Sequence, residues 1–218
     1  FKIYNVLKKL NYSKFDLKIS LPGKKRVNLK NIKIPIIGLH NVRNATAAIA
    51  VSYSIGISND LIKKGLSNFK GVQRRFNHLF NNQGSIFFDD YAHHPTEIVE
   101  MLNAVKEVYK DKEIFCVFQP HRISRLKNLR NQFSLAFKKA DTVILCPIYK
   151  AGESIKLGFN YYNFAKEIAK NSNVNLIIIN NQLELANLVR QSIYGEKIVI
   201  GMGAGSISSW MKQLPKLI

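Results

Sequence analysis

The sequence contains few cysteines and no long apolar run. Only two cysteines occur in 218 residues, Cys116 and Cys146, and both lie in or beside apolar, strand-like segments. Buried reduced thiols explain such a pair better than a disulfide or a metal site does. No apolar stretch reaches the length of a membrane-spanning helix, and no secretory signal pattern opens the chain. We therefore expect a cytoplasmic location, without membrane insertion.

Acidic residues are also scarce. The chain has 14 Asp and Glu against 33 Lys and Arg, which gives a net charge of +19. Such an excess raises the question of nucleic-acid binding. The lysines are scattered, however, and no tract interleaves them with aromatic residues as a strand-binding groove would. A solvated, Lys-rich surface is the favoured interpretation, and attraction of an anionic partner such as a nucleotide substrate is the alternative.

A third absence is the Gly-x-x-x-x-Gly-Lys-Ser/Thr loop that cradles the phosphates of ATP. The run Gly201–Ser206 resembles a dinucleotide-binding motif, but it lies too near the end of the chain for a later strand to carry a ribose-binding acid. It predicts a tight strand-to-helix turn and no redox cofactor. Because residues 1–10 look like the middle of a domain and Phe1 is not a start methionine, we expect the chain to be a fragment.

What the sequence does contain is a regular alternation of strand-like and helix-like runs after residue 84. The expected strands cover 85–88, 114–118, 142–146, 174–179 and 198–201, and the expected helices cover 95–109, 126–139, 162–170 and segments from 183 and 206. This alternation predicts an α/β fold with a mostly parallel sheet and right-handed crossovers. Residues 14–36 read as short strands, followed by helices from residue 38 and from residues 58–59. We place a domain boundary near residue 80, which gives domains 1–80 and 81–218.

Polar residues crowd the end of the first expected strand in the second domain, in the run Asp89–Glu97. Pro95 and Glu97 are explained by a helix start. Asp90 and His93 are not, and because ligands bind at the carboxyl ends of strands in α/β sheets, we interpret both as functional.

Two arginines follow the next expected strand. Arg122 and Arg125 lie three residues apart where a helix begins, so both can reach one side of it. A surface ion pair is the structural interpretation, but a planar guanidinium also matches the two oxygens of a carboxylate ligand. We expect His93, Arg122 and Arg125 to converge on one cavity.

A third polar group opens the long helix after Gly38. His40, Asn41 and Asn44 stand at its N-terminus, where asparagine commonly caps. Capping does not explain Asn44, whose amide could read the edge of an adenine. The pair Arg74-Arg75 follows a glycine turn and meets either phosphate or solvent.

Together these motifs resemble the Mur ligases, the ATP-dependent amino-acid-adding enzymes of peptidoglycan synthesis. The matching segments are 38–45, 71–76, 89–97, 118–125, 149–153 and 202–207. The resemblance is closest to the members that add L-alanine to UDP-N-acetylmuramate. It implies that residues 1–80 are the tail of a central α/β ATPase domain and residues 81–218 a Rossmann-like carboxyl-terminal domain. The UDP-sugar domain and the rest of the ATPase domain would be missing parts, supplied in cis or in trans.

The resemblance also implies a reaction and a set of roles. ATP and Mg²⁺ phosphorylate the muramic acid carboxylate, and the amine of L-alanine attacks the acyl phosphate. The implied ATP contacts are His40, Asn41, Asn44, Arg75 and Asp90. The implied alanine site is Tyr91, His93, Arg122 and Arg125, with His93 as the catalytic residue that orients the amine or takes its proton. The Mg²⁺ ligands would lie mostly outside this chain, and we expect no metal site within it.

Two alternatives stay open. The first is a related Mur ligase that recycles a tripeptide, which looks similar around His93 and His94. The second is a basic, non-catalytic module that binds nucleic acid, which the positive charge would favour. We expect the fragment alone to be inactive, because it lacks the phosphate-binding loop.

Overall fold

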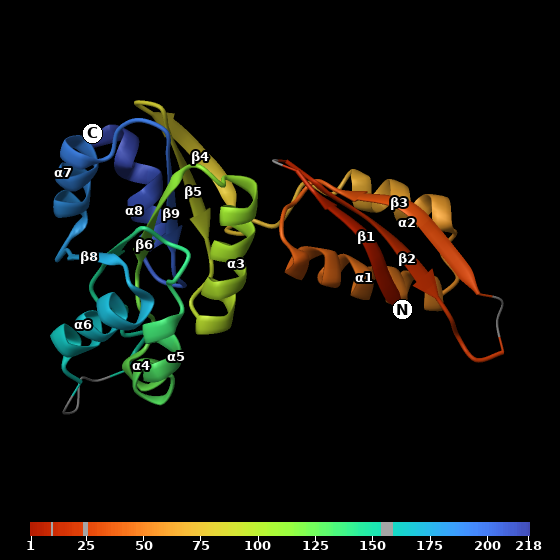
Figure 1. Cartoon of the computed structure of the whole chain (residues 1–218), viewed down its shortest axis with the longest axis horizontal. Coiled ribbons are helices and arrows are strands. Elements are labelled where there is room, and N and C mark those ends of the chain that lie inside the picture. Colours follow the sequence, from red (N-terminus) through yellow and green to blue (C-terminus); the bar gives the residue numbers. More distant parts are fainter. Residues whose placement is uncertain (10, 24–25, 154–158) are drawn as a thin grey trace. The chain divides into compact units, whose positions relative to one another are not determined.

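The computed structural model describes residues 1–9, 11–23, 26–153 and 159–218. Within these ranges the chain divides into two compact units. The first is Phe1–Val72 with Asn103–Tyr109, and the second is Gln73–Leu102 with Lys110–Ile218. Each unit has its own β-sheet (Figure 1).

The first unit combines a three-stranded antiparallel sheet with two helices. Its elements are β1 (Lys2–Lys8), β2 (Ser13–Ile19), β3 (Val27–Ile34), α1 (Leu39–Ser54) and α2 (Asn59–Ser67). Alternate residues of β2 are fully buried, as one face of a strand on a core requires. Val42 and Ile49 of α1 and Ile62 of α2 join the same core. Both predicted helices are present, whereas β1 was not predicted.

The second unit is built on a six-stranded sheet with the order β4-β5-β9-β6-β7-β8. Its strands are β4 (Asn77–Asn82), β5 (Ser85–Asp90), β6 (Glu113–Phe118), β7 (Thr142–Leu145), β8 (Asn175–Ile178) and β9 (Lys197–Met202). Strand β4 runs antiparallel to β5, and all other neighbouring pairs are parallel. The predicted α/β class with a mostly parallel sheet is confirmed.

Helices cover both faces of this sheet. They are α3 (Pro95–Val108), α4 (Ile123–Asn128), α5 (Arg130–Leu135), α6 (Tyr161–Ser172), α7 (Gln182–Ser192) and α8 (Ile207–Gln213), followed by the 3₁₀ turn η1 (Leu214–Lys216). The connections from β5 to β8 advance in one direction across the sheet, whereas the connection from β8 to β9 returns. Because crossovers are right-handed, α7 must lie on the face opposite to the helices before it.

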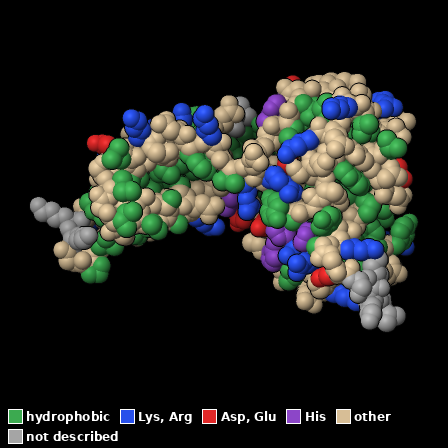
Figure 2. Space-filling view, turned by 180° about the vertical axis from the view of Figure 1, so that it is seen from behind, with side chains coloured by type: hydrophobic (Ala, Val, Ile, Leu, Met, Phe, Trp, Pro, Cys, Tyr) green, Lys and Arg blue, Asp and Glu red, His purple; other side chains and the backbone are tan. Residues whose placement is uncertain are grey.

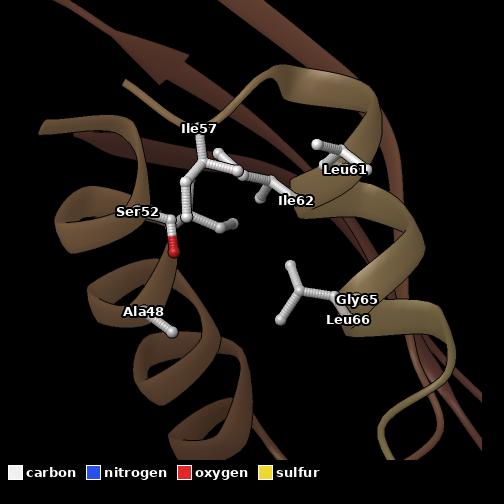
Figure 3. Close-up of a pocket in the computed structure, with 8 residues that line it drawn as sticks. Ala48, Ser52, Ile57, Leu61, Ile62, Gly65 and Leu66 are labelled. Carbon is white, nitrogen blue, oxygen red and sulfur yellow. The ribbon is translucent and has the colours of Figure 1, made fainter. Parts of the chain in front are cut away.

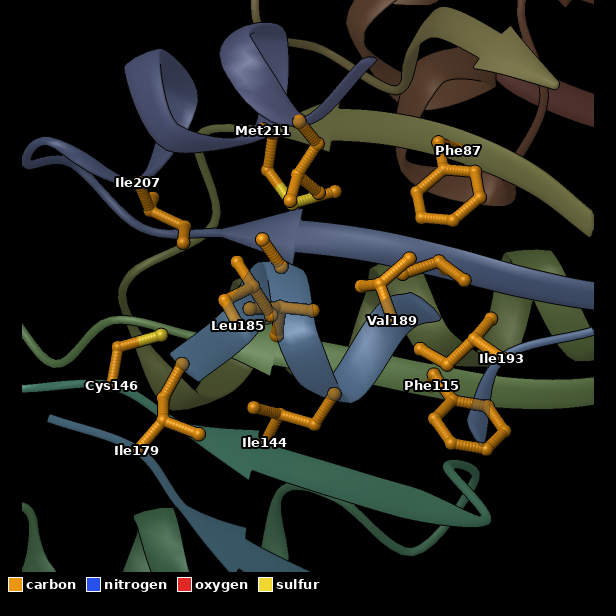
Figure 4. Close-up of a cluster of buried hydrophobic side chains, with 14 residues drawn as sticks. Phe87, Phe115, Ile144, Cys146, Ile179, Leu185, Val189, Ile193, Ile207 and Met211 are labelled. Atoms are coloured by element: carbon orange, nitrogen blue, oxygen red, sulfur yellow. The ribbon is translucent and has the colours of Figure 1, made fainter. Parts of the chain in front are cut away.

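The side chains agree with this arrangement. Leu185 and Val189 of α7 and Met211 of α8 pack on one face of the sheet (Figure 4). On β6, Phe115 belongs to that cluster, while Phe118 contacts Phe133 of α5 on the other face. The alternation of side chains along β6 thus contributes to two cores, which explains why the strand is almost continuously apolar.

Two features differ from the sequence predictions. Strand β4 begins at Asn77, before the boundary expected near residue 80, and pairs with β5. Gln83 and Gly84 form the turn that connects the two strands. These two turn residues have φ of 45° and 85°, as a type I′ turn needs. The helix expected over 126–139 is instead the two short helices α4 and α5, separated at Leu129, which has φ −115° and ψ 20°.

Candidate functional site

Four strands end level with one another at one edge of the six-stranded sheet. Asp90 of β5 and Phe118 of β6 both stand opposite Met202 of β9. Phe118 in turn stands opposite Leu145 of β7. The segments that follow these strands therefore emerge side by side, at the edge where parallel sheets bind ligands. The polar clusters predicted after β5 and β6 both lie here.

Four rings form a row along this edge. Tyr91 and His93 follow β5, and their ring centroids lie 5.1 Å apart. His121, which follows β6, lies 5.7 Å from His93 and stacks on Tyr149 at 5.5 Å. Tyr149 follows β7 and is 42% exposed. This ring row joins segments from three strands into one polar, aromatic surface.

Glu97 holds the segment that carries His93. Its Oε2 accepts the N–H of His93 at 2.9 Å and the N–H of His94 at 3.1 Å. Burial alone would raise the pKa of Glu97, but the His93 N–H, the His93 ring and the His94 N–H outweigh burial and lower it. The lowered pKa favours the ionised carboxylate of Glu97, which stabilises the start of α3 and holds the backbone of His93 in place.

The tautomer of His93 follows from its hydrogen bond. Its Nδ1 lies 2.9 Å from the carbonyl oxygen of Tyr91, and a carbonyl only accepts, so Nδ1 is the donor. In the neutral ring Nε2 is then the acceptor. The geometry leaves His93 able to accept a proton or a hydrogen bond at Nε2.

Arg125 reaches the ring row directly. Its Nη1 lies 3.4 Å from Nδ1 of His121. Arg122 is the N-cap residue of α4 and has a φ of 67°, and its backbone N–H donates to the carbonyl oxygen of Tyr149 at 2.9 Å. The side chain of Arg122 is exposed. Figure 2 shows histidines gathered with Lys and Arg side chains on one side of the second unit.

His121 stands between the predicted residues. Burial, then electrostatic interaction with Arg125, His93 and Arg122, lowers its pKa. A neutral ring can accept a hydrogen bond from Arg125 and stack on Tyr149. The structure thus brings His93 and Arg125 together through His121, with Arg122 close enough to act on the same ring electrostatically.

Asp90 is tied to the backbone on both sides. Its Oδ1 accepts the N–H of Ala92 and its Oδ2 accepts the N–H of Phe76, each at 2.8 Å. The residue is 1% exposed. Burial raises its pKa to about 6, against the opposing effect of the two N–H groups and Arg75. These contacts fasten the segment before β4 to the end of β5, and the ribose contact implied for Asp90 stays a prediction.

Arg75 lies near Tyr91, at one end of the ring row. Its guanidinium carbon is 5.9 Å from the ring centroid of Tyr91, and its N–H donates to Oδ1 of Asn77 at 3.0 Å. The side chain is exposed. It is therefore open to an anionic group, as the predicted phosphate contact requires.

The other predicted ATP contacts belong to the first unit. His40, Asn41 and Asn44 lie in the first two turns of α1, whose N-cap is Gly38 with φ 96°. Nδ2 of Asn41 donates to the carbonyl oxygen of Ile37 at 2.7 Å, so this side chain binds the chain just before the helix. Asn44 is exposed, as an adenine contact requires. The ATP-binding role of all three stays a prediction.

The glycine-rich turn after β9 packs against Gln119. Oε1 of Gln119 accepts the N–H of Ile207 at 3.0 Å, and its Nε2 donates to Oγ of Ser206 at 3.0 Å. Gly203 has a φ of 151°, and a Cβ there would lie 2.8 Å from the carbonyl oxygen of Gln119. Glycine is needed because the two backbones approach so closely. The predicted strand-to-helix turn is thus present.

A pocket of about 260 Å³ lies between α1 and α2 of the first unit (Figure 3). Its lining is mostly apolar and includes Ile49, Leu61 and Leu66. In the described part of the chain, no group of three or more His, Cys, Asp or Glu side chains is placed to hold a metal ion. None of the described helices is long and apolar enough to cross a membrane.

Sequence reasoning did not name His121, Tyr149 or Arg74 as site residues. His121 and Tyr149 follow β6 and β7, so the rule that singled out His93 after β5 also applies to them. For Arg74 the sequence allows a contact with either phosphate or solvent, and nothing in the sequence indicates the contacts that it makes within the fold.

Comparisons with known proteins give the same family as the sequence motifs. A family profile described as "Mur ligase, glutamate ligase domain" matches residues 74–205. The chain is 61% identical to a UDP-N-acetylmuramate–L-alanine ligase of Pelagibacter ubique, over all of this chain and 47% of that protein. It is 41% identical to the enzyme of the same name from Bartonella tribocorum, over 88% of this chain and 40% of that protein. The chain thus spans less than half the length of these relatives.

Solved structures share the fold. The UDP-N-acetylmuramate-alanine ligase from Thermotoga maritima superposes with a TM-score of 0.76 and 26% identity, over 98% of this chain and 44% of that chain. A murein peptide ligase from Psychrobacter arcticus superposes with a TM-score of 0.68 and 20% identity, over 99% of this chain and 43% of that chain. The second likeness bears on the fold alone.

Proposed function

The chain belongs to the Mur ligase family, and we propose that it is the carboxyl-terminal part of an ATP-dependent enzyme that joins L-alanine to UDP-N-acetylmuramate. The observation that carries this proposal is the ring row beside two arginines at the carboxyl ends of β5, β6 and β7. A small amino acid needs a cationic grip for its carboxylate and an acceptor near its amine, and this edge offers both.

Arg122 and Arg125 are the proposed carboxylate ligands, because a guanidinium donates two parallel hydrogen bonds to the two oxygens of a carboxylate. Nε2 of His93 is the proposed acceptor for the amine of alanine, since Nδ1 is engaged with the Tyr91 carbonyl. Tyr91 would complete the alanine site beside that ring. Holding the amine in place in this way converts a bimolecular step into a positioned one.

ATP would supply the phosphoryl group that activates the muramic acid carboxylate, with Mg²⁺ held mostly by residues outside this chain. Within the first unit, His40, Asn41 and Asn44 are the proposed contacts to the adenine part. Within the second unit, Arg75 is the proposed phosphate contact and Asp90 the proposed ribose contact. The exposed side chains of Asn44 and Arg75 support this division of roles. A cytoplasmic location, where these substrates occur, is part of the proposal.

The test is Arg122→Ala in the complete enzyme that carries this chain, followed by phosphate release from ATP with UDP-N-acetylmuramate and L-alanine. Losing a charged hydrogen-bond partner should raise KM for L-alanine by roughly tenfold or more, while KM for ATP stays within about twofold. Arg26→Ala, an exposed residue of the first unit, is the matched control. An unchanged KM for L-alanine would remove Arg122 from the site.

The tripeptide-recycling reaction is the second candidate, because the segment around His93 and His94 also resembles the ligases that recycle a tripeptide. The two reactions differ in the amine substrate, so the discriminating assay offers L-alanine and a murein tripeptide in competition. Preference for L-alanine supports the proposal, and preference for the tripeptide overturns it.

A further inference from the structure

Arg74 connects three segments of the second unit, which lie just before β4, just after β5 and just after β9. Its Nη2 donates to the carbonyl oxygen of Gly203 at 2.6 Å, in the turn after β9. Its guanidinium carbon lies 4.6 Å from the ring centroid of Tyr91, in the segment after β5. Its own carbonyl oxygen accepts the N–H of Tyr91 at 2.7 Å. One residue therefore holds Tyr91 by its backbone and by its ring.

The environment of Arg74 is built for a fixed guanidinium. Its Nε is 3.9 Å from Oδ2 of Asp89, a carboxylate that is 1% exposed and accepts a hydrogen bond from Oγ of Ser208 at 2.6 Å. The side chain of Arg74 is 24% exposed. Its φ of 59° is in the left-handed region, which non-glycine residues adopt rarely. The Tyr91 ring and the Asp89 carboxyl group therefore limit the positions that the guanidinium can take.

We propose that Arg74 is a positioning residue that holds Tyr91, and through it the ring row of Tyr91, His93, His121 and Tyr149, in the geometry that binds the amino-acid substrate. The inference rests on the proposed function, because it assigns the amino acid to this edge. The two neighbouring arginines therefore have different roles. Arg75 is exposed and open to an anion, whereas the side chain of Arg74 is hydrogen-bonded within the second unit.

The mechanism follows from contacts along the row. The Tyr91 carbonyl accepts from Nδ1 of His93, and the Tyr91 ring meets the His93 ring at 5.1 Å. A shift of Tyr91 therefore moves both the plane and the tautomer-setting hydrogen bond of His93. Removing Arg74 should thus weaken binding of the amino acid and leave the binding of ATP alone.

The experiment compares Arg74→Gln and Arg74→Lys in the complete enzyme, with Arg26→Gln as the control for a lost surface charge. We expect Arg74→Gln to raise KM for L-alanine about tenfold, with KM for ATP within about twofold. Lysine keeps the charge but not the planar fork, so Arg74→Lys should recover only part of the loss. A rise in KM for ATP alone would make Arg74 a nucleotide contact and overturn the proposal.

A double-mutant cycle with Tyr91 distinguishes positioning from a general loss of stability. In a Tyr91→Leu background, Arg74→Gln should raise KM for L-alanine by less than about twofold, because the ring it positions is gone. In a Tyr91→Phe background the ring remains and the full effect should return. Equal effects of Arg74→Gln in all three backgrounds would overturn the proposal. If Arg74→Gln does not fold, the same cycle with Arg74→Lys decides.

An NMR measurement distinguishes failure of the positioning role of Arg74 from failure of the proposed function. The ring resonances of Tyr91, observed by NMR in protein labelled at tyrosine, should shift in Arg74→Gln and stay in place in Arg26→Gln. If the parent enzyme does not use L-alanine but the Tyr91 resonances shift, the function fails and the positioning contact stands. If the enzyme uses L-alanine but neither KM nor the resonances change in Arg74→Gln, the positioning role fails and the function stands.

Discussion

Asp90 shows what burial does to a carboxyl group that its backbone partners only partly compensate. Each oxygen accepts one N–H, yet burial still raises the pKa from an ordinary 3.8 to about 6. We expect the carboxyl carbon of Asp90 to titrate near pH 6 in an NMR experiment. Asp16, whose pKa is lowered by the N–H of Asn31 and the side chain of Asn5, should titrate below 3.8 in the same spectra. A midpoint near 4 for Asp90 would contradict the burial argument.

The raised pKa also has a consequence for stability. The folded state binds the Asp90 proton more tightly than the unfolded state, so this contribution is fully present below pH 3.8 and is lost as the pH rises through about 6. The difference is worth roughly 3 kcal/mol at most. Asp90→Asn should therefore flatten the decline of the unfolding free energy between these pH values, measured by urea denaturation.

At the level of single residues, the sequence indicated part of the candidate site. His93, Arg122 and Arg125 stand out because charged and imidazole side chains follow apolar strands, and the fold brings two of them to His121. His121 itself was missed because it lies inside the motif and looks like a spacer between Pro120 and Arg122. The role of Arg74 depends on Gly203, which lies 129 residues away, and no local pattern encodes such a contact.

Among the elements, the turn after β9 has a tightly constrained backbone. A Cβ at Gly203 would lie 2.8 Å from a carbonyl oxygen and 3.1 Å from Cγ2 of Ile207, and the φ of 151° is strained for any other residue. We expect Gly203→Ala to lower stability by about 3 kcal/mol or more, and the melting temperature by roughly 10 °C.

Gly195→Ala is the matched control for that substitution. Gly195 also has a positive φ, 76°, but a Cβ there meets nothing within 4 Å. Its replacement should therefore cost only the backbone strain, about 1 kcal/mol. Equal falls in the melting temperatures of the two variants, measured by calorimetry, would show that the close approach to Gln119 is not tight.

The elements that the sequence did not predict have physical reasons in common. Strand β4 is rich in asparagine, which disfavours strands, and it exists because it pairs with β5. The break at Leu129 lies inside a segment whose apolar spacing suits one continuous helix, so the spacing alone did not predict it. Periodicity predicted the parallel strands well because buried strands read as plain apolar runs.

For the whole molecule, the composition indicated a folded protein with a strongly basic surface but did not say which anionic partner it binds. The net charge of +19 is compatible both with nucleic acid and with anionic nucleotide substrates. The exposed Arg75 lies 5.9 Å from the ring of Tyr91, and the exposed Arg122 follows β6, so both arginines are open to an anionic ligand at the sheet edge. The alternation of strands and helices predicted the second unit, whereas the boundary at Val72 depends on the pairing of β4.

The last prediction concerns the activity of the 218-residue chain by itself. In P-loop enzymes, the backbone N–H groups and the lysine of one loop surround the phosphates of ATP, and the 218 residues contain no such motif. We expect the purified 218-residue chain to release no phosphate from ATP when UDP-N-acetylmuramate and L-alanine are both present. A longer protein that adds the remaining length of the Pelagibacter ubique relative, of which this chain covers 47%, should restore turnover. Phosphate release that depends on L-alanine in the 218-residue chain alone would mean that this fold binds ATP phosphates by another route, and the division of labour proposed for its two units would have to be abandoned.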